Sequence, residues 1–373
     1  MRKIQMVDLK GQYEKIKDQV NTSILEVLDS TAYINGPEVK GFQSELETYL
    51  GVKHVIPCAN GTDALQIAMM GLGLKPGDEV ITADFTFAAT VEVIALLGLT
   101  PVLVDVDPDD FNIDVSAIEK AITPKTKAIV PVHLFGQCAN MDAIMALAEK
   151  HDLFVIEDNA QAIGANYDSK KGLQKAGTIG HVASTSFFPS KNLGCYGDGG
   201  AIFTNDDALA HTIRGIVNHG MYKRYHHDVV GVNSRLDSVQ AAVLRTKLKN
   251  LEDYNAARQL AASKYDAAFA SFKNIITPVR NGHHVFHQYT LKVKNIDRDA
   301  LAQFLNDNAI PCGVYYPIPL HSQKAYADSR YNESDFPVTN QLITEVISLP
   351  MHTELDDEQI SFIAAKVIEF ITK

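Results

Sequence analysis

Cysteine is scarce in this chain of 373 residues, and its four cysteines, Cys58, Cys138, Cys195 and Cys312, are widely separated. No two of them form a Cys-x-x-Cys pair, so the pattern offers neither a zinc or iron–sulfur site nor a disulfide framework. The adjacent histidines at 226–227 and 283–284 do not change this, because neighbouring side chains of a strand point to opposite faces. We expect reduced, buried cysteines and no bound metal.

Basic residues are also fewer than acidic ones, 34 against 45, and the net charge is −11. A chain of this sign does not attract nucleic acid or an anionic membrane surface. The sequence lacks an export signal at its start and any apolar run near the ~18 residues of a membrane span. We therefore expect a cytoplasmic protein, and the length suits two or three domains.

What the first two-thirds of the chain contains is an alternation of apolar runs with helix-period segments. The alternation predicts a doubly wound α/β domain with a mostly parallel sheet that is buried on both faces. The expected strands are 54–59, 78–84, 101–107, 126–136, 153–158, 181–188 and 199–205, and the expected helices are 62–74, 88–98 and 141–151. The last two strands are close enough in sequence to form a hairpin-like pair.

The pattern changes after residue 236. We expect one long helix over 237–270, strands over 283–294 and 312–318, and helices over 298–308 and 357–372. The chain therefore divides into a large domain, 1–236 with an N-terminal arm, and a segment 237–373 that comprises a long linking helix and a smaller α+β domain.

The turn between the first strand and its helix, residues 57–65, is a candidate anion site. The backbone N–H groups of Gly61, Thr62 and Asp63 are free at the start of a helix and point beyond the end of the strand. The alternative is a plain helix cap in which Asn60 or Thr62 satisfies those groups.

A second candidate is the pair Glu157 and Asp158 at the carboxyl end of a very apolar strand, where ligands of open α/β sheets bind. A carboxylate there suits a metal ligand, a general base or the partner of a cationic ring nitrogen. A helix cap is again the alternative.

The third candidate is Lys191, which follows a strand of small and aromatic residues and is flanked by Pro189 and Gly194. Most loop lysines are solvated surface charges, but a desolvated lysine has a lowered pKa and can form an imine. A phosphate-binding turn, a strand-end aspartate and a buried lysine are together what pyridoxal 5′-phosphate requires.

Five ordered segments also resemble a known family, the pyridoxal-phosphate-dependent nucleotide-sugar aminotransferases of the DegT/DnrJ/EryC1/StrS type. The segments are ANGTDAL (59–65), GDEVITADFTFAAT (77–90), EDNAQAIGA (157–165), SFFPSKNLGCYGDGGAI (186–202) and GVNSRLDSVQAAVL (231–244). The resemblance spans almost the whole chain and implies the aspartate aminotransferase-like fold, which is pyridoxal-phosphate fold type I.

The resemblance also implies a role for each matching residue. Lys191 is similar to the lysine that holds the cofactor as a Schiff base, the internal aldimine, and Asp158 to the partner of the pyridinium nitrogen. The other cofactor contacts that it implies are Gly61, Thr62 and Ser186 at the phosphate, Phe87 on the ring face, Gln161 near the phenolic oxygen and Asn233 from a neighbouring subunit. The last of these implies a homodimer with shared active sites.

Within the family, CANGTDALQIA, RYHHDVVGVNSRLD and YYPIPLH most resemble aminotransferases of UDP-2-acetamido-2-deoxy-3-oxo-glucuronate. This implies transfer of an amino group from L-glutamate to C3 of that sugar, which gives the 3-amino sugar of surface polysaccharide such as O-antigen. Arg235, from the partner chain, and Tyr315 and Tyr316 are the implied substrate contacts. Such enzymes carry His-Tyr where this chain has Tyr315-Tyr316, so another UDP- or dTDP-linked 3-keto or 4-keto hexose is the alternative substrate.

Three other functions fit less well. A non-catalytic protein of this fold is expected to lack Lys191 or Asp158, and the related dehydratases carry histidine at the lysine's position. A nicotinamide-dependent dehydrogenase needs a glycine fingerprint after the first strand, and the sequence offers none.

Overall fold

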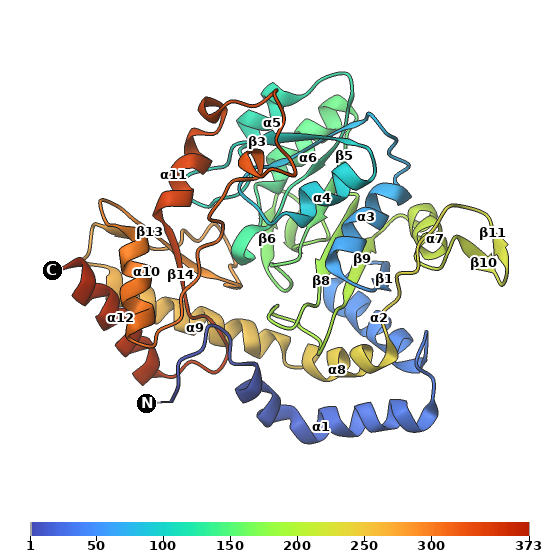
Figure 1. The fold of residues 1–373 in the computed structure, drawn as a ribbon. Helices are drawn as coiled ribbons and strands as arrows, with labels where there is room; N and C mark the ends of the chain where they lie inside the picture. The colour runs from blue at the N-terminus through green and yellow to red at the C-terminus, as the bar shows by residue number, and fades with distance from the viewer. Residues whose placement is uncertain (1, 373) are drawn as a thin grey trace.

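The computed structural model describes residues 2–372, and its centre is a seven-stranded sheet in the order β1-β9-β8-β5-β4-β2-β3 (Figure 1). The neighbours from β3 to β8 pair in parallel, whereas β9 runs antiparallel to both β8 and β1. The strands are β1 (His54–Cys58), β2 (Glu79–Ala83), β3 (Thr100–Val104), β4 (Thr126–Val130), β5 (Phe154–Asp158), β8 (Val182–Ser186) and β9 (Gly200–Thr204). The predicted mostly parallel sheet and the predicted pairing of the last two strands are confirmed.

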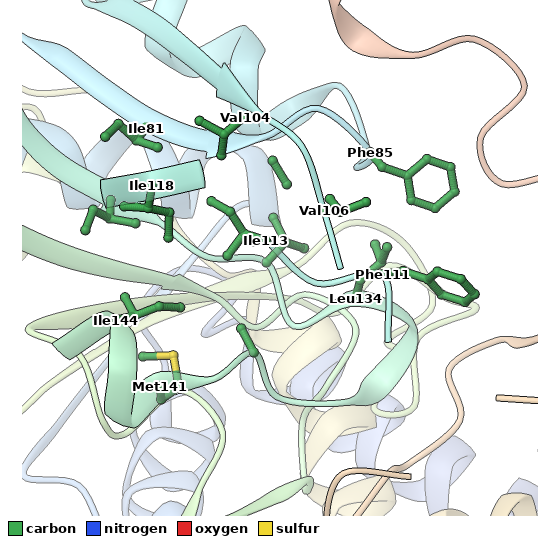
Figure 2. Packing of buried hydrophobic residues seen from close by; sticks show 14 of the residues in the cluster. Ile81, Phe85, Val104, Val106, Phe111, Ile113, Ile118, Leu134, Met141 and Ile144 are labelled. Carbon is green, nitrogen blue, oxygen red and sulfur yellow. The ribbon is translucent and has the colours of Figure 1, made fainter. Parts of the chain in front are cut away.

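Both faces of the sheet are buried, as the near-continuous apolar runs predicted. Successive residues of a strand point to opposite faces, and Val80 and Ile81, for example, belong to different apolar clusters. The helices α3 (Gly61–Gly71), α4 (Ala89–Leu96) and α7 (Asp207–Ile216) cover one face. The helices α5 (Val115–Ala121) and α6 (Met141–His151) cover part of the other face, where the cluster in Figure 2 lies.

The rest of that second face packs against α2 (Pro37–Leu50) and α8 (Ser238–Leu248). The helix α1 (Leu9–Ser30), for which we predicted no element, lies along α8 at the lower edge of Figure 1. Small hairpins, β6 (Asn166–Ser169) with β7 (Gly172–Lys175) and β10 (Met221–Lys223) with β11 (His226–His227), extend from the body.

The long helix expected over 237–270 is in fact two helices, α8 and α9 (Leu251–Phe269). The break falls at Asn250, whose backbone leaves the helical region with φ −108° and ψ 4°. Its side-chain amide donates to the carbonyl of Thr246 at 3.1 Å, and such a bond competes with the helical pattern. Propensity alone did not reveal this break, because the residues on both sides favour a helix.

The smaller sheet is antiparallel and contains β12 (Ile275–Ile276), β13 (Tyr289–Val293) and β14 (Val346–Leu349). Together with α9, α10 (Arg298–Asp307) and α12 (Asp357–Ile371) it encloses its own apolar cluster. The remaining elements are α11 (Pro337–Glu345) and the short 3-10 turns η1 (Leu134–Gly136), η2 (Leu320–Ser322) and η3 (Glu333–Asp335). The domain boundary at 236/237 stays a prediction.

Three of the expected strands depart furthest from the structure. The strand expected over 126–136 ends at Val130, and that expected over 283–294 begins only at Tyr289. The segment 312–318 forms no strand and makes one isolated bridge, from Gly313 to Ser348. Pro317 has no N–H to give to a sheet, and the residues before it line a cavity.

Two of the expectations from composition can be placed on the fold. Cys58, Cys138 and Cys195 are buried and Cys312 is half-buried, and all four are free thiols. Across residues 2–372, no helix combines the length and the hydropathy that crossing a bilayer requires.

Candidate active site

A cavity of about 630 Å³ opens at the carboxyl ends of β1, β5 and β8, between the large sheet and the segment 314–317. Ligands of open α/β sheets bind at this edge. Its wall contains nine of the eleven residues that the sequence predicted for the site: Gly61, Thr62, Phe87, Asp158, Gln161, Ser186, Lys191, Tyr315 and Tyr316. Residues that are distant in sequence are thus brought to one place, although their roles stay predictions.

The N-terminus of α3 forms one side of the cavity. Asn60 caps this helix, because its side-chain oxygen accepts from the Asp63 amide at 2.8 Å. The plain-cap interpretation is therefore right for Asn60, but the cap uses only one amide. The amides of Gly61 and Thr62 have no carbonyl partner within the helix and are available to an anion.

Glycine at position 61 permits a close approach between α3 and the end of β8. A Cβ atom there would lie 2.6 Å from Cβ of Ser186 and 3.1 Å from its hydroxyl oxygen. The free amides and the Ser186 hydroxyl can therefore act on one small anion. Any side chain at position 61 would push them apart.

Asp158 ends β5 with its carboxylate toward the cavity and is 5% exposed. One carboxylate oxygen accepts from the amide of Ala160 at 3.1 Å and the other from the hydroxyl of Thr90 at 2.9 Å. Burial raises the pKa of Asp158, and these two hydrogen bonds and the charge of Lys191 partly offset that effect. The sequence did not predict Thr90, because its contact with β5 depends on how α4 packs.

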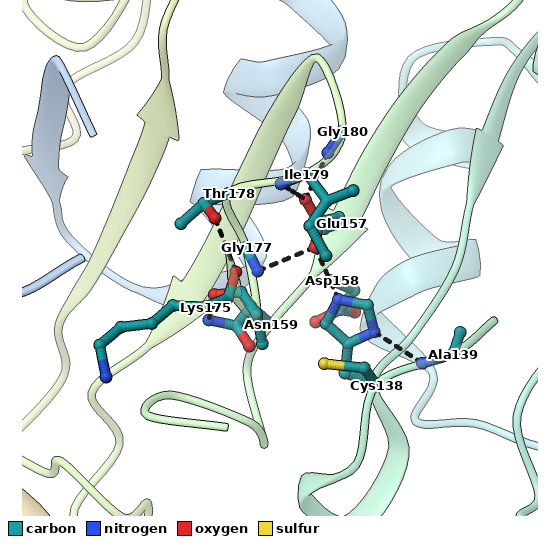
Figure 3. A network of polar contacts seen from close by, with 12 residues as sticks. Cys138, Ala139, Glu157, Asp158, Asn159, Lys175, Gly177, Thr178, Ile179 and Gly180 are labelled. Carbon is teal, nitrogen blue, oxygen red and sulfur yellow. Dashed lines mark hydrogen bonds and ion pairs between the residues drawn. The ribbon is translucent and has the colours of Figure 1, made fainter. Parts of the chain in front are cut away.

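Glu157 does not line the cavity; it is fully buried in a network of polar contacts (Figure 3). Its carboxylate accepts from His133 Nε2 at 2.8 Å and from the amides of Gly177, Ile179 and Gly180 at 2.6 to 2.8 Å. Burial opposes ionisation, but the hydrogen bond and charge of His133 and the amides outweigh it, so the pKa of Glu157 is lowered. The sequence alone did not distinguish the roles of Glu157 and Asp158. Because consecutive side chains of β5 point to opposite faces of the sheet, the two carboxylates lie in different environments.

Lys191 lies in the loop after β8, and its side chain is half-buried in the cavity wall. Hydrogen bonds from its own amide to the carbonyl of Phe188 (2.8 Å) and from the Cys195 amide to Phe187 (2.8 Å) hold this loop. Burial lowers the pKa of Lys191 to about 8, and the charge of Asp158 opposes that shift. A substantial fraction of the amine is therefore neutral near pH 8, as a nucleophile requires.

Aromatic rings form the wall opposite α3. The hydroxyl of Tyr316 accepts from the Gln161 side-chain amide at 3.1 Å, and the Gln161 oxygen accepts from the Phe135 amide at 2.7 Å. Phe87 is 57% exposed, and its ring centroid lies 6.3 Å from that of Tyr316. His287, which the sequence analysis did not single out, also lines the cavity.

The two remaining predicted residues, Asn233 and Arg235, do not line the cavity of their own chain. Asn233 bridges to Asn218 through the backbone, and a guanidinium nitrogen of Arg235 donates to the Asn218 side chain at 3.3 Å. The resemblance assigns Asn233 and Arg235 to a neighbouring subunit's site, and that assignment stays a prediction.

No three or more histidine, cysteine, aspartate or glutamate side chains gather to hold a metal ion anywhere in residues 2–372. The cavity instead combines a half-buried amine, a buried carboxylate and free helix amides at the carboxyl edge of a mostly parallel sheet. Together with the fold, this combination defines an aminotransferase of fold type I. The crystal structure of DesV from S. venezuelae in complex with a ketimine intermediate superposes with a TM-score of 0.95 at 38% identity, over 100% of both chains.

The profile of the DegT/DnrJ/EryC1/StrS aminotransferase family matches residues 14–368, and the chain belongs to this family. It is 50% identical to a UDP-2-acetamido-2-deoxy-3-oxo-D-glucuronate aminotransferase of Pseudomonas aeruginosa, over 97% of this chain and 99% of that relative. It is also 45% identical to a UDP-N-acetyl-3-dehydro-alpha-D-glucosamine 3-aminotransferase of Acidithiobacillus ferrooxidans, over 98% of this chain and 97% of the other.

Proposed function

We propose that this aminotransferase uses pyridoxal 5′-phosphate to move an amino group from L-glutamate to the C3 keto group of UDP-2-acetamido-2-deoxy-3-oxo-glucuronate. The product is the corresponding 3-amino sugar, for surface polysaccharide such as O-antigen, made in the cytoplasm. The main support is one pairing in the cavity wall, the half-buried amine of Lys191 with the buried carboxylate of Asp158.

The residues present fit that cofactor. The close approach of Gly61 to Ser186 brings two free amides and a hydroxyl together on the cavity wall, where they can bind a phosphate. Asp158 keeps an ionisable carboxylate away from water, as the partner of a ring nitrogen must, and Thr90 fixes its orientation. Phe87 supplies an exposed aromatic face, and Gln161 a side-chain amide, on the same cavity.

When bound, pyridoxal phosphate supplies a protonated ring that takes up the electrons released as the substrate's Cα–H bond breaks. The Asp158 carboxylate would hold the ring nitrogen and stabilise its positive charge. Lys191 Nζ, with its lowered pKa, would accept the proton from the donor's Cα and donate a proton at the keto carbon of the sugar. Overall, L-glutamate would lose its amino group and become 2-oxoglutarate, and the keto sugar would become the 3-amino sugar.

The substrate assignment rests on the two relatives named above, both of which act at C3 of a UDP-linked sugar by their names. Tyr315 lines the cavity at the position where such enzymes carry histidine, and this difference supports one alternative. The alternative is the same reaction on another UDP- or dTDP-linked 3-keto or 4-keto hexose.

A homodimer would complete the site. Phe87 and Phe188, at 57% and 52% exposed, lie on the cavity wall and are large apolar side chains in contact with water. Exposed apolar surface beside a cavity is typical of an interface. A second copy would cover part of this apolar surface and bring its own Asn233 and Arg235 toward the sugar diphosphate.

The test uses borohydride reduction of the protein with its cofactor, followed by peptide mapping. The cofactor should be attached to the peptide that contains Lys191. Lys247 is a built-in control, since its pKa is also lowered to about 8 by burial but it lies outside the cavity wall. Attachment at Lys247, or at no lysine, would contradict the proposal. Turnover of UDP-linked against dTDP-linked keto sugars then separates the two substrates.

A further inference from the structure

A buried histidine–aspartate pair connects two segments that form the aromatic side of the cavity. Asp84 follows β2 and is fully buried. The backbone amide of His321 donates to one of its carboxylate oxygens at 2.7 Å, and His321 Nδ1 lies 2.7 Å from the other. Both contacts with the Asp84 carboxyl group therefore come from one residue, His321.

The surroundings hold this imidazole in one orientation. Its ring stacks on Phe336 with centroids 4.4 Å apart and planes 8° from parallel. The other nitrogen, Nε2, lies 3.4 Å from the largely exposed Glu333 carboxylate. Asp105 is a further charge near Asp84, and the amide of Leu320 donates to the Asp84 carbonyl at 3.3 Å.

Each partner is a few residues away from cavity-lining side chains, although neither lines the cavity itself. Asp84 directly precedes Phe85, Thr86 and Phe87, and His321 follows Tyr316 by five residues. The ring of Tyr316 packs against the segment that follows Asp84, with centroid distances of 6.0 Å to Phe85 and 6.3 Å to Phe87. Any shift of His321 relative to Asp84 would therefore move Tyr316 relative to Phe87 and Gln161.

We propose that the Asp84–His321 pair is a positioning device that sets the Tyr316 hydroxyl against Gln161 and the face of Phe87, and so shapes the substrate side of the cavity. The inference rests on the proposed function, because it concerns the reaction assigned above. A buried pair is weak evidence for stability, since apolar residues of similar size often stabilise as well. What the pair supplies is a fixed geometry, and a misplaced reacting group costs rate.

Two substitutions of His321 separate geometry from stability. Asn places an amide N–H close to the position of Nδ1 and retains the contact with Asp84, whereas Leu fills the space and loses it. In His321→Leu we expect amide hydrogen exchange over 314–320 to accelerate by about ten-fold in the cofactor-free protein. We also expect KM for the keto sugar to rise by about ten-fold with kcat less affected, and His321→Asn to restore both values toward wild type.

His54 offers a matched control, because its Nε2 lies 2.7 Å from a carboxylate oxygen of Asp207 but outside the cavity wall. His54→Leu should leave both measurements unchanged. In the Tyr316→Phe background, His321→Leu should add little further loss of kcat/KM, because both changes act on the same hydroxyl.

The proposal would be overturned if the losses of kcat/KM in Tyr316→Phe and His321→Leu were additive. It would also be overturned if His321→Asn and His321→Leu behaved alike, or if hydrogen exchange over 314–320 did not change in His321→Leu. If His321→Leu does not fold, Asp84→Asn takes its place in the cycle with Tyr316→Phe. Absence of aminotransfer in the wild type would instead contradict the proposed function, whereas the exchange measurement on cofactor-free protein would still test the positioning role.

Discussion

Substitution of Gly61 by alanine tests whether the N-terminus of α3 binds the cofactor's phosphate. The added methyl would lie 2.6 Å from Cβ of Ser186, so α3 and the end of β8 must move apart. Overpacking of this kind costs about 1–3 kcal/mol of folding stability. Moving two amides away from a charged phosphate removes hydrogen bonds worth about 1.5–3 kcal/mol each. Loss of one to two such bonds weakens binding by about ten- to ten-thousand-fold.

The assay is titration of the cofactor-free protein with pyridoxal phosphate and, separately, with pyridoxal, followed by absorbance. Gly61→Ala should weaken binding of the phosphorylated compound far more than binding of pyridoxal, because only the former uses the helix amides. Gly71→Ala, in the same helix, is the matched control. Its added methyl would lie 2.8 Å from a side-chain carbon of Ile213, outside the cavity wall.

Gly71→Ala should therefore lose stability without a selective loss of phosphate binding. The reasoning would be refuted if Gly61→Ala bound both compounds with equal losses, or if its selectivity matched that of Gly71→Ala. At fixed ionic strength, chloride or sulfate should also compete less well with pyridoxal phosphate for this site in Gly61→Ala than in wild type.

Three further predictions concern the charged groups. Because the pKa of Lys191 is lowered to about 8, the folded state binds fewer protons than the unfolded state between about pH 8 and pH 10.5. In urea unfolding at pH 7, the free energy of unfolding of cofactor-free Lys191→Met should thus exceed that of wild type by about 1–3 kcal/mol. This difference should shrink as the pH rises to 10.5. A difference that stays constant with pH would refute the desolvation argument. Thr90→Val removes a hydrogen bond to Asp158 and should therefore raise the pKa of that carboxyl further. Aminotransferase activity should fall by about ten-fold, and the loss should be greatest at low pH. An activity with the same pH dependence as wild type would contradict this prediction. Glu157→Gln leaves His133 and three amides facing a neutral group, so we expect the free energy of unfolding to fall by about 3 kcal/mol. The absorbance spectrum of the bound cofactor should not change. An altered spectrum would give Glu157 a role that its orientation excludes.

Local patterns sufficed to predict three groups that the structure brings to one cavity: the turn at Gly61 and Thr62, Asp158 and Lys191. Asp158 and Lys191 both follow strands whose apolar runs identify a parallel sheet, and the carboxyl ends of such strands meet at one edge. The turn at Gly61 and Thr62 joins the first strand directly to a helix. Each of these features lies within about ten residues, which is why the sequence was enough for them.

Contacts between distant segments were not predictable in the same way. The hydrogen bond from Thr90 to Asp158 and the pairing of His321 with Asp84 depend on how α4 and the segment after Tyr316 pack. The break at Asn250 depends on one side-chain bond within a sequence that otherwise favours helix. The strand expected over 312–318 was wrong because its aromatic residues are used by the cavity rather than by a sheet.

The most direct test of the proposed reaction follows the nitrogen atom. The protein with its cofactor is mixed with ¹⁵N-labelled L-glutamate and UDP-2-acetamido-2-deoxy-3-oxo-glucuronate, and the sugar product is analysed by mass spectrometry. The account predicts a 3-amino sugar that carries the label, formed in equal amount with 2-oxoglutarate, and none from Lys191→Ala. Recovery of unlabelled sugar, or label transfer that survives loss of Lys191, would contradict it.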